Sequence, residues 1–81
     1  MTDEFKYFNR HERKILNLLY RARIKMSTLD ISRRLSMHWT TAEDSLGNLE
    51  DEGWVIREEM SNKTLWQFNF ERYGELKRVY E

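Results

Sequence analysis

The pattern of apolar residues in this chain changes its period at Gly53. Before that glycine, "TTAEDSLGNLEDE" (residues 40–52) has apolar residues at helical spacing, with Thr40 and Glu43 as N-terminal capping residues. The predicted buried stripe of this helix is Ala42, Leu46 and Leu49. After Gly53, which suits the left-handed residue that ends a helix, "WVIREEM" and "TLWQFNF" are rich in β-branched and aromatic residues. Because "SNK" between them is typical of a turn, the sequence predicts a helix followed directly by a two-stranded β-hairpin.

Two further helices are predicted upstream, each with its own capping residue. Asn9 and Glu12 form a capping box at the start of the first helix, and Ser27 caps the second. The apolar residues at helical spacing are Ile15, Leu18, Leu19 and Ala22 in the first helix and Ile31 and Leu35 in the second. Residues 23–26 are expected to be a short extended connector, and "SMHW" (residues 36–39) a tight turn.

The two ends of the chain carry apolar residues that the central elements do not require. Residues 1–8 form a short arm whose aromatic residues are Phe5, Tyr7 and Phe8. Residues 71–81 return to helical spacing, and their apolar side consists of Tyr73, Leu76, Val79 and Tyr80. An 81-residue chain buries only a modest core, so we expect this side to pair two copies across a two-fold axis, with help from the arm. The alternative is that it folds back over the first helix. The chain is thus divided into an arm (1–8), one domain (9–70) and a C-terminal helix (71–81) that is a candidate dimerisation element.

Composition excludes several classes of function. The chain has no cysteine, which excludes disulfides, zinc–thiolate sites and thiol nucleophiles. Its two histidines, His11 and His38, lie on different predicted elements, and neither a metal-ligand spacing nor a phosphate-binding glycine loop is present. We therefore expect no enzymatic activity, no metal or other cofactor, and no small-molecule ligand. The sequence contains neither a membrane-spanning apolar run nor a signal-peptide pattern, which favours a cytoplasmic protein without a membrane partner.

The formal net charge is zero, but the charges are unevenly distributed. Residues 1–34 contain nine Lys or Arg and four Asp or Glu, whereas residues 35–81 contain five and ten. Between Arg34 and Arg57 there is no basic residue. Such asymmetry indicates a polyanion partner for the basic part, or simply solvated helix faces.

The order of elements and one long segment resemble a known class of DNA-binding domain. "ISRRLSMHWTTAEDSLGNLEDEGWVIRE" (residues 31–58) resembles the second helix, turn, recognition helix and first wing strand of MarR-, ArsR- and PadR-type regulators. The matching positions are Thr41, Ala42, Leu46, Leu49, Gly53, Trp54, Val55 and Arg57. The resemblance covers roughly residues 9–70 and implies an α+β winged helix-turn-helix fold: a three-helix core, a two-stranded hairpin wing and a C-terminal helix. It also implies a transcriptional regulator that binds double-stranded DNA sequence-specifically as a homodimer.

The resemblance further implies which residues contact DNA. The turn and the start of the recognition helix would face the major groove through Ser36, His38, Trp39, Thr40 and Thr41, followed along the exposed face by Asp44 and Asn48. Phosphate contacts from the second helix would be Ser27, Thr28, Arg33 and Arg34. Wing contacts would be Arg57, Asn62 and Lys63.

The acidic third helix keeps a second interpretation open. Regulators that bind DNA usually have Lys or Arg on the outward face of this helix, where this chain has Glu43, Asp44 and Asn48. A winged helix that docks on another protein through this helix would carry such a face. The hairpin aromatics Trp54, Trp66, Phe68 and Phe70 could stack on single-stranded nucleic acid, but their alternation favours packing in the core.

Overall fold

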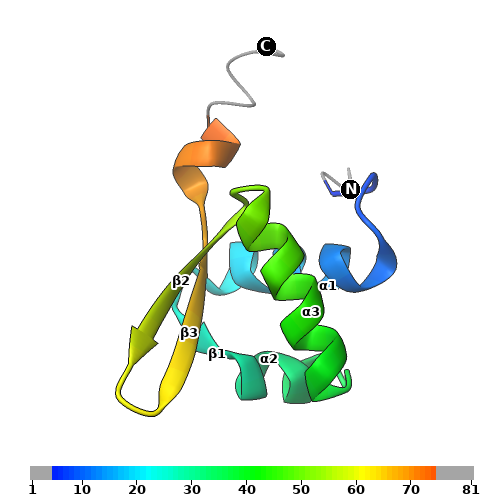
Figure 1. Ribbon diagram of the computed structural model, residues 1–81. Helices are drawn as coiled ribbons and strands as arrows, with labels where there is room; N and C mark the ends of the chain where they lie inside the picture. The colour runs from blue at the N-terminus through cyan, green and yellow to red at the C-terminus, as the bar shows by residue number, and fades with distance from the viewer. Residues whose placement is uncertain (1–4, 75–81) are drawn as a thin grey trace.

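The computed structural model describes residues 5–74. Its helices are α1 (Arg10–Ala22), α2 (Thr28–Arg34) and α3 (Trp39–Asp51), and its strands are β1 (Met26–Ser27), β2 (Val55–Met60) and β3 (Lys63–Phe68). The predicted order of three helices followed by a hairpin is confirmed. Figure 1 shows α3 running from α2 towards the end of the hairpin that lies opposite the hairpin's turn.

Two of the three predicted caps are present, and the third is wrong. The Asn9 side chain accepts a hydrogen bond from the Glu12 backbone N–H at 2.8 Å, and Glu12 completes the capping box. The Ser27 hydroxyl accepts from the Asp30 N–H at 3.1 Å. At α3, however, the N-cap is His38 and not Thr40, because the His38 Nδ1 accepts from the Thr40 N–H at 3.2 Å. The helix therefore begins at Trp39, and Glu43 lies beyond the first turn.

The sheet has three strands where the sequence predicted two. β3 is central and pairs antiparallel with both β1 and β2. The predicted connector supplies β1, in which Met26 lies opposite Trp66 and Ser27 lies opposite Leu65. Gly53 adopts the expected left-handed backbone conformation with φ 83°. Ser61 also has positive φ in the turn between β2 and β3. The pairing of β1 anchors the hairpin to the segment that leads into α2.

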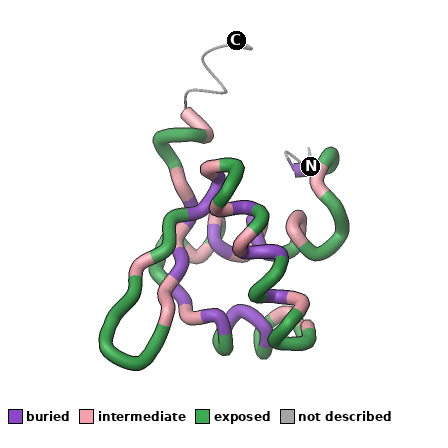
Figure 2. Tube along the Cα trace, in the orientation of Figure 1, coloured by how far each residue is buried: buried purple, intermediate pink, exposed green. Residues whose placement is uncertain are grey.

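The core lies where α1, α2, α3 and the sheet meet (Figure 2). The predicted stripe of α3 is buried, with Ala42, Leu46 and Leu49 all fully inaccessible. Trp54, Trp66 and Phe68 are buried as predicted for core packing, whereas Phe70 is exposed. The other buried apolar residues are Phe5, Ile15, Leu16, Leu19, Met26, Ile31 and Val55. The expected help of Phe5 in dimer pairing is thus wrong, because its ring is 2% exposed and packs against α1 and β3 within one chain.

The described part of the chain ends in a helical turn at residues 70–74. Its first turn is fixed by Asn69, whose side-chain oxygen accepts from the Arg72 N–H at 3.1 Å and whose amide donates to the Gly53 carbonyl at 2.8 Å. Tyr73 is half-buried, and its ring lies against Phe5, Tyr20 and Phe68. Leu76, Val79 and Tyr80 lie outside the described residues, so their role in dimerisation stays a prediction.

Candidate nucleic-acid interface

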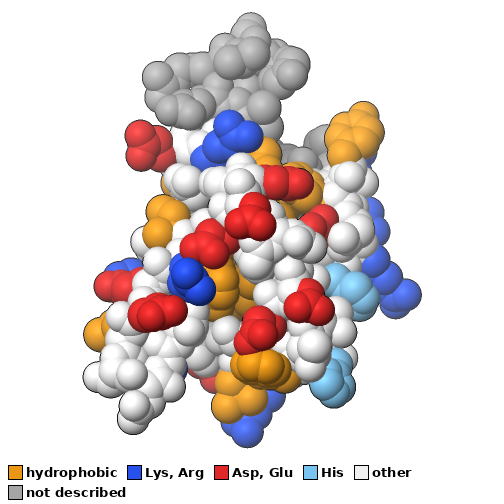
Figure 3. Space-filling model, viewed as in Figure 1, with side chains coloured by type: hydrophobic (Ala, Val, Ile, Leu, Met, Phe, Trp, Pro, Cys, Tyr) orange, Lys and Arg blue, Asp and Glu red, His pale blue; other side chains and the backbone are white. Residues whose placement is uncertain are grey.

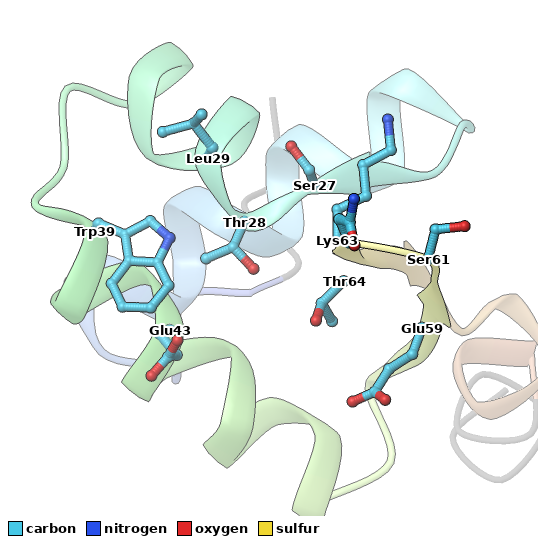
Figure 4. A pocket seen from close by; sticks show the side chains of 10 residues that line it. Ser27, Thr28, Leu29, Trp39, Glu43, Glu59, Ser61, Lys63 and Thr64 are labelled. Atoms are coloured by element: carbon cyan, nitrogen blue, oxygen red, sulfur yellow. The ribbon is translucent and has the colours of Figure 1, made fainter.

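A groove opens between the start of α2, the start of α3 and the turn of the hairpin (Figure 4). Its volume is about 570 Å³, and its lining is Ser27, Thr28, Leu29, Trp39, Glu43, Glu59, Ser61, Asn62, Lys63 and Thr64. Three elements that are far apart in the sequence therefore form one concave surface, and residues of all three were predicted as DNA contacts.

A buried hydrogen bond fixes the relative position of two of these elements. The Trp66 Nε1–H on β3 donates to the Thr28 hydroxyl at the start of α2, at 2.8 Å. Both residues are buried, at 4% and 8% exposure. Thr28 therefore holds the wall of the groove in place. Its hydroxyl oxygen accepts this hydrogen bond while its O–H can still donate, and Thr28 lines the groove, so the predicted phosphate contact from Thr28 stays a prediction.

The first turn of α3 presents both polar and apolar groups to the groove. Trp39 is the first residue of the helix, and 46% of its surface is exposed, which is a large apolar area for a surface position. Trp39 and Glu43 are four residues apart and so share a face of the helix, and Figure 4 shows both beside the groove. Thr40 is exposed and Thr41 half-buried. His38 is exposed, but its capping hydrogen bond already uses one ring nitrogen.

The turn between α2 and α3 is closed by backbone hydrogen bonds. The Met37 N–H donates to the Ser32 carbonyl at 2.8 Å, and the Ser36 N–H donates to the Arg33 carbonyl at 3.2 Å. Ser36 has φ 50°, in the left-handed region. The position of Ser36 thus has a local conformational role in addition to its predicted contact with DNA.

Acidic side chains gather over α3 (Figure 3). Among the described residues, Glu43, Asp44, Asp51 and Glu52 form no ion pair. Glu50 pairs with Arg57, whose Nε lies 3.4 Å from the Glu50 carboxylate, and Arg57 also lies 3.7 Å from Glu59. Arg57, a predicted wing contact, is therefore already neutralised by two carboxylates.

The predicted phosphate contacts divide between two surfaces. Ser27, Asn62 and Lys63 line the groove beside α3. Arg34 lies elsewhere, in a second groove between α1 and α2. Arg33 is exposed and lines neither groove, and Asp44 and Asn48 are exposed further along α3.

Sequence reasoning missed four groove residues: Leu29, Glu59, Ser61 and Thr64. Ser61 and Thr64 flank the predicted wing tip, so the signal for them was the turn itself. Leu29 gave no signal, because an apolar residue in a helix is ordinarily assigned to the core, yet it is 46% exposed.

Two properties concern the described residues as a whole. Within residues 5–74, no three His, Cys, Asp or Glu side chains are grouped so that they could hold a metal ion. No helix in this part of the chain is long and apolar enough to span a membrane.

The sequence matches no known protein-family profile and no curated protein, but the structure resembles several solved structures. One is a fragment of a possible transcriptional regulatory protein from Mycobacterium bovis, with 24% identity over 89% of this chain and 75% of that one, at a TM-score of 0.73. A solution structure from the same organism describes such a fragment as a homodimeric winged helix-turn-helix DNA-binding domain of a possible ArsR-family regulator. A second is the Zα domain of PKZ from Carassius auratus in complex with Z-DNA, with 25% identity over 74% of this chain and 94% of that one, at a TM-score of 0.67. A third is a hypothetical protein of Pyrobaculum spherical virus, with 32% identity over 82% of this chain and 42% of that one, at a TM-score of 0.67.

Proposed function

We propose that this chain, which has the winged helix-turn-helix fold, binds double-stranded DNA sequence-specifically and acts as a transcriptional regulator in the form of a homodimer. The observation that carries the proposal is the groove that joins the start of α2, the first turn of α3 and the tip of the hairpin. In this arrangement the first turn of α3 enters the major groove, while the hairpin lies along the adjacent backbone.

The acidity of α3 is compatible with this orientation because its charges are spread along the helix. Thr40 and Glu50 are ten residues apart, which corresponds to about 15 Å along a helix axis. That distance exceeds the Debye length of about 8 Å at physiological ionic strength, so charges at the far end are largely screened from phosphates near Thr40. Among the α3 carboxylates only Glu43 and Asp44 lie close enough to oppose binding, and Glu59 of β2 also lines the groove. A carboxylate in the major groove can accept a hydrogen bond from a cytosine amino group.

Attraction to phosphates is assigned to Arg33 and Lys63. Both are exposed, and neither forms an ion pair among the described residues. Base reading is assigned to the first turn of α3, mainly to Trp39, Thr40 and Thr41, since phosphate contacts position a protein whereas contacts to base edges specify sequence.

Homodimer formation is supported by two observations. Leu76, Val79 and Tyr80 lie at helical spacing in the sequence, and a similar M. bovis fragment is homodimeric. Tyr73, the fourth residue predicted for this interface, instead packs within the chain against Phe5, Tyr20 and Phe68. Leu76→Glu would introduce a charge into such an interface. Sedimentation should then show a dimer in the parent protein and a folded monomer in the variant, and a monomeric parent at working concentration would refute the dimer.

The test of DNA binding is fluorescence anisotropy with a random duplex and with duplexes selected from a random library. Lys63→Ala and Arg33→Ala should weaken binding to all sequences alike and lower the slope of log affinity against log salt by about one each. Thr41→Ala should instead reduce the difference between selected and random duplexes. Arg72→Gln is the matched control, because it removes the same charge beside Gly53, at the opposite end of α3. If the parent protein binds no duplex at low salt, the proposal is wrong.

A second candidate function is supported by the unpaired carboxylates of α3. In this alternative, α3 docks on a partner protein and not on DNA. Asp44→Lys distinguishes the two: it should raise nonspecific DNA affinity if α3 faces the duplex. If the domain binds only protein, the same change should abolish partner binding and leave DNA affinity negligible.

A further inference from the structure

A second groove lies between α1 and α2 and carries positive charge around an apolar floor. Its volume is about 500 Å³, and its floor is formed by Leu18, Ala22 and Leu35. Lys14 and Arg21 of α1 and Arg34 of α2 line it. Lys14 and Arg21 are seven residues apart, or two helical turns, so they lie on the same side of α1. None of the three cations forms an ion pair among residues 5–74, and the groove therefore presents a triple positive charge to whatever enters it.

The C-terminal end of α3 carries the opposite charge, with more carboxylates than cations around it. Asp51 is the last residue of the helix and Glu52 is its C-cap. The partial negative charge of a helix C-terminus disfavours acidic residues there. Both side chains are exposed, and neither forms an ion pair in the described part of the chain, whereas the neighbouring Glu50 is paired with Arg57. Within residues 5–74 the nearest cation is Arg72, which lines the same hollow but forms no ion pair with either carboxylate, and the hollow remains acidic because Glu50 and Glu71 also line it.

The two surfaces cannot neutralise each other within one molecule. No residue of α3 lines the α1–α2 groove, and Figure 1 shows α3 leading away from α2 towards the start of β2. Both surfaces nevertheless occur in one chain whose formal net charge is zero. A second copy therefore offers the charge complement that the groove lacks, in the form of the exposed acidic end of α3.

We infer that the acidic end of α3 in one copy docks into the basic α1–α2 groove of the next copy. Asp51 and Glu52 lie against Lys14, Arg21 and Arg34, and the apolar floor is covered by the end of the incoming helix. Each partner uses a different surface, so the contact is head-to-tail and adds copies in a row without closing a symmetric pair. This contact is separate from the two-fold pairing through residues 71–81 and leaves the groove beside Trp39 free.

The contact should be weak and strongly dependent on salt. It relies on exposed ion pairs, which are individually weak and easily screened. Association should therefore be visible at high protein concentration and low salt, and absent at high salt. The test needs no DNA, so its failure and the failure of the DNA-binding proposal are distinguishable.

The experiment is sedimentation velocity on the full chain over a range of protein concentrations, at about 0.01 M and about 1 M salt, where the Debye length falls from about 30 Å to about 3 Å. The parent protein should form species larger than its high-salt form only at low salt. Two double variants each change one surface. The first, Asp51→Lys/Glu52→Lys, reverses the charge of the helix end, and the second, Lys14→Glu/Arg21→Glu, reverses the charge of the groove. Each variant alone should remain at the size of the high-salt form.

Mixing the two variants tests the head-to-tail geometry. The intact groove of the first variant can accept the intact helix end of the second, and the two charge-reversed surfaces are also complementary, so the mixture should regain the association that each variant alone has lost. Glu43→Lys/Asp44→Lys is the matched control, with the same change of charge in the first half of α3, and it should still associate. Thermal melting checks that every variant is folded.

Three results would overturn the inference. The first is a parent protein whose size is independent of salt. The second is a pair of variants that associate as the parent does. The third is a mixture of the two variants that remains at the size of its components.

Discussion

Replacing Thr28 with valine hardly changes the shape of the side chain, but it should lower the free energy of unfolding markedly. The Thr28 hydroxyl accepts the 2.8 Å hydrogen bond from the Trp66 indole, and both residues are at most 8% exposed. Valine keeps the volume and the branching at Cβ but removes the acceptor. The Trp66 N–H then stays buried without a partner, at a cost of about 1–3 kcal/mol.

The size of this effect can be measured by urea unfolding and by thermal melting. For a domain of this size, each kcal/mol lowers the melting temperature by about 4–8 °C. Thr64→Val is the matched control, since Thr64 is half-exposed on β3 and forms no side-chain hydrogen bond among the described residues. It should change stability by no more than about 0.5 kcal/mol, as is usual at the surface.

A double-mutant cycle isolates the hydrogen bond from the loss of packing. Trp66→Phe removes the donor, so adding Thr28→Val to that variant should have almost no further effect. A coupling energy of about 1 kcal/mol or more is expected for two groups in direct contact. Equal unfolding midpoints for Thr28→Val and Thr64→Val would refute the reasoning. So would a Thr28→Val effect of the same size in the parent protein and in the Trp66→Phe variant.

Three further changes test the helices by the same unfolding measurements. Leu46→Ala should cost about 2–5 kcal/mol, because Leu46 is fully buried at the centre of the α3 stripe; a loss below about 0.5 kcal/mol would contradict that placement. Gly47→Ala should stabilise by up to about 1 kcal/mol, since glycine disfavours a helix interior and a Cβ at this position meets no atom within 4 Å. Its failure to stabilise would point to a close neighbour of Gly47. Asn9→Ala should cost about 0.5–2 kcal/mol through loss of the α1 capping box, and an unchanged midpoint would show that this end of α1 is not held by its cap.

The sequence predicted best those features that depend on one local signal. Asn9, Ser27 and Gly53 each act on a few neighbouring backbone groups, so their roles follow from residue type and spacing. The hairpin was predictable for a similar reason, since two β-rich segments lie on either side of a turn. The α3 stripe was predictable because the period of a buried helix face is fixed by helix geometry.

The features that the sequence did not predict depend on contacts between distant residues. β1 is only two residues long and exists because Met26 and Ser27 meet β3, which is about forty residues further along the chain. The cap of α3 was assigned to Thr40 because hydroxyl residues are the commonest N-caps, yet the His38 ring occupies that role.

Part of the candidate interface was also unpredictable, because it depends on charge pairing between α3 and β2 and on helix packing. The neutralisation of Arg57 arises from Glu50 on α3 and Glu59 on its own strand, and only the fold brings Glu50 near. The separation of Arg34 from the groove beside α3 depends on how α1 and α2 pack. The direction of an exposed side chain around a short helix is not fixed by its residue type.

The burial of Phe5 has a consequence for how the chain acquires its structure during synthesis. Its ring lies 5.8 Å from the ring of Phe68 and 6.2 Å from that of Tyr73, although more than sixty residues separate them in the sequence. A nascent chain exposes Phe5 first and supplies these partners only near the end of the described segment. Contacts between residues so far apart in sequence form late, since the intervening loop must close before they stabilise anything. We therefore expect the helices to gain structure while the chain is still growing, whereas the aromatic cluster that joins the two ends forms only once translation has passed Tyr73.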